Sequence, residues 1–167
     1  TNTNEGTAYT GALAGYTTGA TTITNCGSYA TLTGKSNVGG LVGHANGSTN
    51  LNGTVFEAVV SGTNNVGGAV GKYTSSTTLT NISVVNTQVN GTSYVGGVIG
   101  YMLNGGITSS QLVTQNTSVT ADYVAGGVVG YAEANIENLT ATNVNISAKG
   151  YIGGVAGYIA EDVTVSG

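Results

Sequence analysis

Tyrosine is the residue whose placement in this 167-residue sequence most clearly suggests chemistry at a surface. Six tyrosines stand on either side of Gly-Gly segments in the C-terminal half of the chain: Tyr94, Tyr101, Tyr123, Tyr131, Tyr151 and Tyr158. An aromatic ring with a polar tip combines apolar contact area with a hydrogen bond, which suits sugar rings or a partner protein. We therefore predict a ligand-binding surface at these six residues. The alternative is that the rings stack on their own repeats and only cover the fold.

The other residues that could do chemistry predict neither catalysis, nor a metal site, nor a cofactor. His44 is the only histidine and Cys26 the only cysteine, so we expect no zinc site and no internal disulfide. Glu133 and Glu161 could pair as in a glycosidase, or bind calcium weakly. β-Helix lyases and hydrolases usually add Arg or Lys in a cleft, and this sequence has no arginine. A carbohydrate-active enzyme is therefore a remote alternative, and we expect no enzymatic activity.

Composition argues against two further classes of partner. Only 6% of the residues are charged and the formal net charge is −4, whereas nucleic acid needs basic side chains opposite its phosphates. No run approaches the ~18 apolar residues of a membrane-spanning helix. Hydrophobic residues still reach 40%, which is enough for a core. We expect a folded protein that binds no nucleic acid and has no membrane span.

A repeated glycine box must position the tyrosines. It reads Val-Gly-Gly-Leu-Val-Gly at residues 38–43, and further copies lie at residues 11–15 (degenerate), 66–71, 95–100, 125–130 and 152–157. The last glycines of the copies recur at steps of 28, 28, 29, 30 and 27 residues. A period of this size is typical of a solenoid. Glycines at fixed places predict a tight corner, through a left-handed turn or a close approach of two backbones.

Two further extended runs follow each box. The first is anchored by Ile23, Leu51, Leu79, Ile107, Ile136 and Val163, and the second by Leu32, Val60, Val89, Val119 and Ile146. Apolar and hydroxyl residues alternate in residues 30–34, which is the pattern of a half-buried strand. We predict one all-β domain over residues 1–167, a parallel β-helix (β-solenoid) of about six coils of ~28 residues with three strands each. Right-handed winding is expected from the general preference of parallel crossovers.

The repeated (V/I)-G-G-(L/V)-(V/I)-G box with Thr- and Asn-rich filler resembles the GLUG motif. GLUG repeats occur in bacterial surface and secreted proteins, including adhesin-like proteins and the non-catalytic regions of zinc metalloproteases that cleave immunoglobulin A. Ala12 and Ala125 depart from the pattern in the first and fifth boxes. The resemblance implies a surface-attached or secreted, extracellular β-solenoid with an adhesive or spacer role and no catalysis.

We therefore expect a non-catalytic extracellular module, either a mature product or a section of a longer protein, that binds host or microbial glycans or proteins. The main alternative is a self-assembling fibre subunit or homo-oligomer, because a solenoid leaves open strand edges at its ends. Ice binding is a remote alternative, since the outward threonine columns are mixed with asparagine and other residues.

Overall fold

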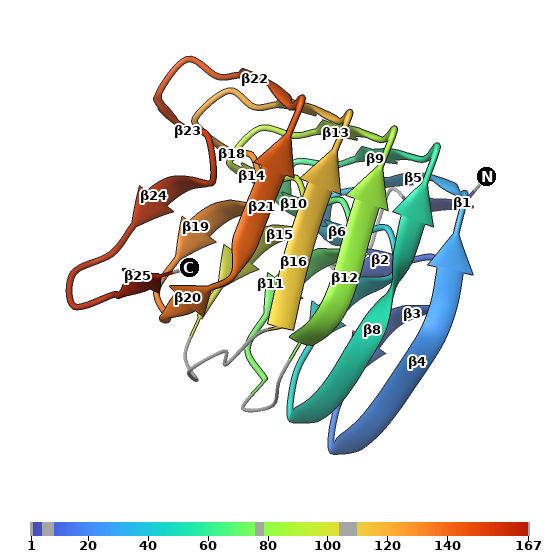
Figure 1. Cartoon of the computed structure of the whole chain (residues 1–167). Coiled ribbons are helices and arrows are strands. Elements are labelled where there is room, and N and C mark those ends of the chain that lie inside the picture. The colour runs from blue at the N-terminus through green and yellow to red at the C-terminus, as the bar shows by residue number, and fades with distance from the viewer. Residues whose placement is uncertain (1, 5–8, 76–78, 104–109, 167) are drawn as a thin grey trace.

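The computed structural model describes residues 2–4, 9–75, 79–103 and 110–166, and these residues form an all-β solenoid without helix (Figure 1). Every strand pairs in parallel with the equivalent strand of the next coil. The strands thereby stack into four main sheets, which we call A to D, and a small two-stranded sheet E. The predicted fold class is confirmed.

Sheets A and B each contain six strands. Sheet A is formed by β1 (Asn2–Asn4), β5 (Thr31–Gly34), β9 (Val59–Ser61), β13 (Gln88–Asn90), β17 (Ser118–Thr120) and β22 (Asn145–Ser147). Sheet B is formed by β2 (Thr10–Gly11), β6 (Ser36–Gly39), β10 (Asn64–Gly67), β14 (Tyr94–Gly96), β18 (Val124–Gly126) and β23 (Tyr151–Gly153).

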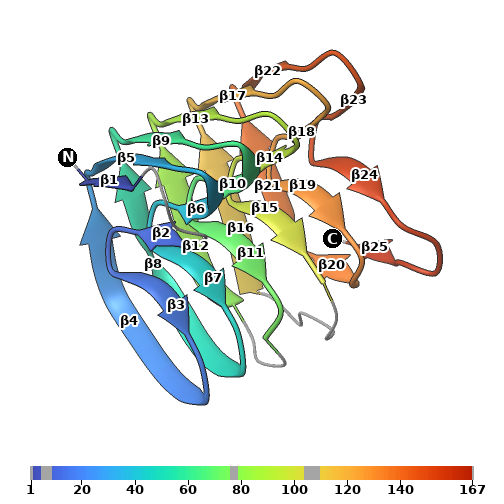
Figure 2. The same ribbon diagram turned by 180° about the vertical axis from the view of Figure 1, so that it is seen from behind.

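Sheets C and D lie on opposite sides of the molecule, sheet D facing the viewer in Figure 1 and sheet C in Figure 2. Sheet C is formed by β3 (Ala14–Thr17), β7 (Val42–Ala45), β11 (Val70–Tyr73), β15 (Ile99–Met102), β19 (Val129–Ala132) and β24 (Ala156–Ile159). Sheet D is formed by β4 (Ala20–Ser28), β8 (Ser48–Phe56), β12 (Leu79–Val85), β16 (Ser110–Gln115) and β21 (Leu139–Thr142). Sheet E pairs β20 (Ile136–Glu137) with β25 (Val165–Ser166).

The glycine box forms the predicted tight corner, with a strand on each side of it, so the box contributes two strands rather than the one that three strands per coil requires. In the second coil, β6 ends at Gly39, the chain turns at Gly40 and Leu41, and β7 begins at Val42. A coil therefore contributes strands to four sheets instead of three, and the solenoid has about five turns rather than six. In the described part of the chain, the sixth coil contributes β22, β23 and β24 to sheets A, B and C but adds no strand to sheet D.

Close backbone packing is the physical reason for the sharp corner. A Cβ atom added to Gly40 would overlap the carbonyl oxygen of Gly68 in the next coil, and one added to Gly43 would meet backbone atoms of sheet B. Among the described glycines, positive φ is found only at Gly19 and Gly47, outside the boxes. The box glycines therefore allow backbone segments of neighbouring coils to approach closely. The alternative explanation, a left-handed turn at these glycines, is wrong.

The core consists of stacked apolar columns inside the coils. Leu32, Val60, Val89 and Val119 pair in register along sheet A and are fully buried, as predicted, and Ile146 continues the column. Ile23, Leu51 and Leu79 align in sheet D, and Ile107 lies outside the described residues. Ile136 pairs with Val165 rather than with the predicted Val163.

Residues with a left-handed backbone conformation form a second type of corner, between sheets D and A. Glu57, Asn86, Asn116 and Asn143 have φ angles of 50°, 51°, 48° and 51°. Asparagine tolerates this conformation better than most residues. The loops rich in Asn thus form turns, as expected from the sequence. No helix in the described part of the chain is long and apolar enough to cross a membrane.

Candidate functional site: tyrosines beside the glycine corner

The glycine corner brings together residues from the two ends of one box. Tyr94 begins β14 in sheet B, and Tyr101 lies in β15 of sheet C. Because the chain folds back sharply between these strands, the centroids of the two rings lie 5.6 Å apart. The residues that precede and follow a box in the sequence thus lie on one surface.

Stacking of coils extends this pair into a ladder. Tyr101, Tyr131 and Tyr158 pair in register along sheet C, with ring centroids 5.2 Å and 4.7 Å apart. The second pair is stacked at an interplanar angle of 10°. Tyr94 also contacts Tyr131 at 4.9 Å, and Tyr151 meets Tyr158 edge-on at 5.4 Å. Five of the six predicted tyrosines therefore form one continuous network of rings.

Tyr123 stands apart from the ring network but borders the same hollow. Val124, the next residue, pairs in register with both Tyr94 and Tyr151, so Tyr123 is shifted by one position. Its side chain is 61% exposed. A pocket of about 370 Å³ is lined by Tyr94, Tyr123, Val124, Tyr131, Gly150, Tyr151 and Tyr158. We call the six predicted tyrosines the tyrosine cluster.

The surroundings of two tyrosine hydroxyls in the cluster raise their pKa. The Tyr101 hydroxyl donates a hydrogen bond of 2.8 Å to Oε1 of Glu133. Burial and this carboxylate raise the pKa of Tyr101 far above its ordinary value, and burial and Glu133 also raise the pKa of Tyr131. Lys72 lies one coil away, with its Nζ 5.4 Å from the Tyr101 ring centroid, which is within cation–π range.

The two acidic residues that the sequence offered as a remote alternative have different surroundings. Glu133 follows β19 and accepts a hydrogen bond from the Tyr101 hydroxyl, whereas Glu161 is exposed in the turn after β24. Among the described residues, no three His, Cys, Asp or Glu side chains are grouped so that they could hold a metal ion. Lys149 forms an ion pair of 2.7 Å with Asp122 beside the pocket.

A second aromatic group occupies the equivalent positions near the N-terminus. We call Tyr9, Tyr16 and His44 the N-terminal aromatic group; their ring centroids lie 5.1 to 5.4 Å apart. None of these three residues is among the six tyrosines predicted from the sequence to bind a ligand. The signal was present, because Tyr9 precedes Gly11 by the same two positions as Tyr94 precedes Gly96.

His44 is half-buried and neutral at neutral pH. Burial, and secondarily the positive charge of Lys72, lower its pKa to about 4. Its Nε2 is hydrogen-bonded to Oγ1 of Thr74 at 2.8 Å, and its buried Nδ1 has no hydrogen-bond partner in the described structure. Tyr16, His44 and Lys72 pair in register, so one column joins the N-terminal aromatic group to the tyrosine cluster.

One segment of the chain matches the model of a known protein family. The family model of the GLUG motif matches residues 121–147, which contain the box at residues 125–130. Neither the curated proteins nor the solved structures contain a match. The chain therefore contains a GLUG motif at residues 121–147, in agreement with the resemblance that its glycine boxes suggest.

Proposed function

We propose that this chain is a non-catalytic, extracellular adhesin-type module that binds a glycan through the tyrosine cluster. The observation that carries the proposal is the continuous network of five rings, four of which line a pocket of about 370 Å³. This volume is within the range of ordinary small-ligand pockets. The GLUG motif supports an extracellular setting, because such repeats resemble parts of bacterial surface and secreted proteins.

The lining of the pocket suits a sugar better than a charged ligand. Rings supply flat apolar area, and their hydroxyls supply hydrogen bonds at the rim. No Asp, Glu, Lys or His side chain is among the lining residues of the pocket. The Lys149 ammonium, which borders the neighbouring hollow, is already paired with Asp122.

The members of the cluster divide into supporting and contacting residues. Tyr101 is partly buried and its hydroxyl is occupied by Glu133, so it supports the other rings. Tyr123 and Tyr151 are each 61% exposed at the pocket, so they are the residues that a glycan would contact first. Removing exposed rings tests binding with little effect on the core.

A glycan array probed with the full chain tests this function. We expect defined glycans to bind and the double variant Tyr123→Ala/Tyr151→Ala to lose at least about tenfold in affinity, which is roughly 1.4 kcal/mol. Tyr9→Ala/Tyr16→Ala is the matched control, because both rings are exposed, at 39% and 43%, and neither lines the pocket. The proposal is wrong if no glycan binds, or if the double variant binds as well as the control. Capture of a protein instead of a glycan would assign the same surface to a protein partner.

End-to-end assembly is the second candidate function. It is supported by exposed apolar side chains on the last strands, with Ile152, Ile159 and Val165 at 53%, 42% and 47% exposure. The strands β22, β23 and β24 also each lie at the edge of a sheet. Electron microscopy over a range of concentrations would reveal fibres of the parent chain, and Ile152→Lys/Ile159→Lys should prevent them. A monomer at all concentrations would exclude this candidate.

A further inference from the structure

The outer face of sheet D carries a repeated order of side chains that the tyrosine cluster does not involve. On two neighbouring coils an amide, a small residue and an aromatic ring follow one another at alternate positions. These residues are Asn25, Gly27 and Tyr29 in one coil, and Asn52, Thr54 and Phe56 in the next. Gly27 pairs in register with Thr54, and the rings of Tyr29 and Phe56 meet edge-on at 5.8 Å.

A break in strand register hollows this face between β4 and β12. Ile23 pairs with Leu51 and Cys26 with Gly53, so β4 contains one residue more than β8 over this span. β12 also contains an extra residue relative to β8. The extra positions are bulges at Asn25 and Asn81, whose φ angles are 54° and 51°.

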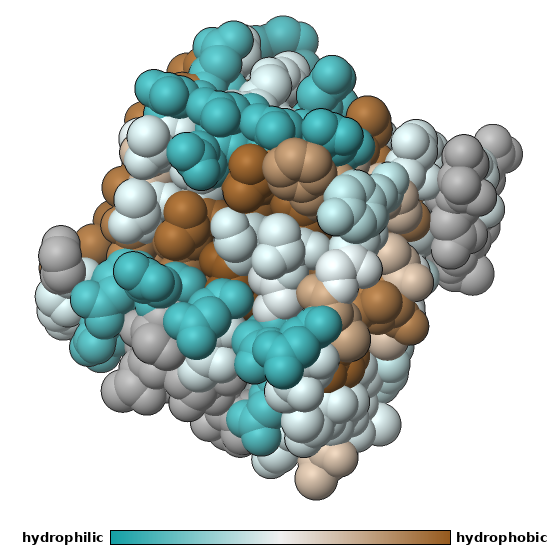
Figure 3. All heavy atoms as spheres, turned by 45° about the vertical axis from the view of Figure 1, so that its right-hand side comes forward, coloured by the Kyte–Doolittle hydropathy of each residue, from teal (hydrophilic) through white to brown (hydrophobic). Residues whose placement is uncertain are grey.

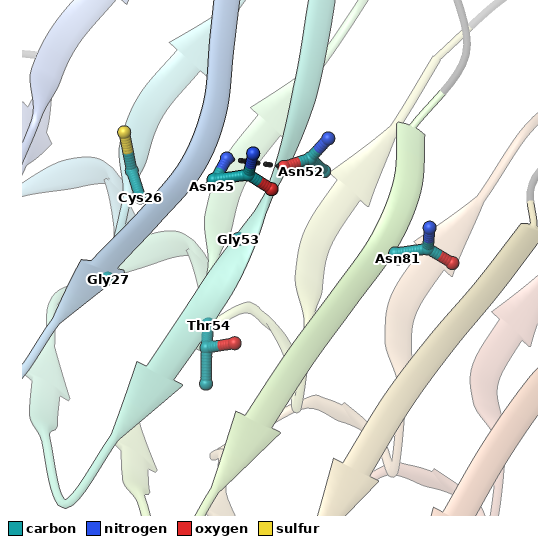
Figure 4. Close-up of a pocket in the computed structure, with 7 residues that line it drawn as sticks. All are labelled: Asn25, Cys26, Gly27, Asn52, Gly53, Thr54 and Asn81. Atoms are coloured by element: carbon teal, nitrogen blue, oxygen red, sulfur yellow. Dashed lines mark hydrogen bonds between the residues drawn. The ribbon is translucent and has the colours of Figure 1, made fainter.

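β8 lacks this bulge, and a pocket of about 330 Å³ lies between the two bulged strands (Figure 4). Its lining residues are Asn25, Cys26, Gly27, Asn52, Gly53, Thr54 and Asn81. A Cβ atom on Gly27 would have only the carbonyl oxygen of Thr54 nearby, at 3.7 Å, so the space above this glycine is open. We call this pocket the sheet D hollow.

The polar side chains of the sheet D hollow are three amides, the hydroxyl of Thr54 and the thiol of Cys26. The backbone N–H of Asn25 donates a hydrogen bond of 2.6 Å to Oδ1 of Asn52, which leaves the Asn52 Nδ2 group as a donor. In Figure 4 the side-chain nitrogens of Asn25, Asn52 and Asn81 are directed to the same side of the sheet. Three consecutive coils thus present amide donors along one edge of the hollow.

Two positions after Gly27 and Thr54, beyond the lining of the hollow, the outer face becomes aromatic. Tyr29 is 72% exposed, and Phe56 is partly exposed beside it. On the side of the molecule that carries sheet D, Figure 3 shows hydrophobic surface between two hydrophilic bands. The residues that line the hollow carry no charge, which disfavours an anion, and they include no carboxylate for a metal ion. Neutral hydroxyl groups beside an apolar ring face are the complement of this surface.

We propose that the sheet D hollow is a second ligand site, which binds one neutral sugar ring. The ring lies over Gly27 and Thr54, its hydroxyl groups bond the amides of Asn52 and Asn81, and its apolar edge contacts Tyr29. The site is independent of the proposed function of the tyrosine cluster, which lies on sheets B and C. Binding by so few polar groups is weak, with a dissociation constant on the order of 1 mM.

Titration of the ¹⁵N-labelled full chain with the methyl glycosides of glucose, mannose and galactose tests the proposal by NMR. We expect at least one sugar to give saturable shifts of the side-chain amide signals of Asn25, Asn52 and Asn81. Gly27→Phe fills the hollow from outside, and should weaken that binding at least about tenfold. Thr140→Phe is the control, because Thr140 is exposed in the same outward row on β21, away from the hollow.

A second variant keeps the test decisive if Gly27→Phe does not fold. Asn81→Gly removes one amide and retains the positive φ, so binding should weaken roughly threefold to tenfold. The proposal is overturned if none of the three sugars gives saturable shifts at these amides, or if shifts occur only at the tyrosine cluster. Unchanged affinity in a folded Gly27→Phe variant would overturn it equally.

Discussion

The N-terminal aromatic group and the tyrosine cluster occupy the same positions of the repeat, yet they offer different surfaces. In the N-terminal group the ring of His44 is half-buried and bonded to Thr74. In the tyrosine cluster Tyr123 and Tyr151 are 61% exposed beside a pocket. The glycine corner brings aromatic rings together in both groups, and the groups differ in degree of exposure, since Tyr9 and Tyr16 are 39% and 43% exposed.

The largest effect is expected from a change at the corner that both regions share. Gly127 lies at the turn of the fifth box, beneath the tyrosine cluster, and a Cβ atom there would overlap the carbonyl oxygen of Gly154. Gly127→Ala should destabilise the solenoid by about 3 kcal/mol, because backbone, rather than a movable side chain, blocks the new atom. Denaturant unfolding monitored by circular dichroism measures the loss.

Gly154→Ala is the matched control for this prediction. Gly154 occupies the equivalent corner of the last box, and a Cβ atom there would have no neighbour within 4 Å. Its unfolding midpoint should stay close to that of the parent chain. Equal destabilisation by the two substitutions would show that close packing is not the reason for glycine at these corners.

The second prediction separates the two aromatic regions by binding. Tyr123→Ala/Tyr151→Ala should weaken glycan binding at least about tenfold, whereas Tyr9→Ala/Tyr16→Ala should leave it within about twofold. The physical reason is that the pocket is lined by the first pair and not by the second. Isothermal titration with a glycan selected on the array measures both. If the two double variants lose affinity equally, ligand binding is not confined to the tyrosine cluster.

The sequence predicted the parts of this arrangement that depend on periodicity. Leu32 and Val60 stack as expected, because an apolar side chain that recurs at each coil has only the interior in which to be buried. The corner at the box was predicted, but its position at Gly40 and the resulting fourth strand were not, since they depend on contact with the backbone of another coil. The bulge at Asn25 was also missed, because its effect appears only beside the unbulged β8.

The third prediction concerns His44, which has no equivalent in the tyrosine cluster. Its folded-state pKa of about 4 is below the ordinary 6.5, so the folded state binds fewer protons than the unfolded state between these pH values. This contribution to stability is complete above pH 6.5 and is lost as the pH falls towards 4. Partial solvent exposure screens the effect, and we expect about 1 kcal/mol.

His44→Tyr provides the comparison, because tyrosine is the common residue of this column. The free energy of unfolding of the parent chain should fall more between pH 6.5 and pH 4.5 than that of His44→Tyr, since the two chains share all their carboxylates. Parallel pH profiles for the two chains would contradict the lowered pKa.

The smallest effect is expected at Lys72, which lies between the two regions. Its Nζ is 5.4 Å from the Tyr101 ring centroid, and its charge helps to lower the pKa of His44. Lys72→Met should remove a cation–π contact of about 0.5 kcal/mol and raise the pKa of His44, but only in part, because burial is the larger cause. NMR titration of the His44 imidazole measures this pKa.

Lys72 is not a lining residue of the tyrosine pocket, so Lys72→Met should leave the glycan affinity unchanged. If Lys72→Met weakened glycan binding as well, the two aromatic regions would act as one binding surface.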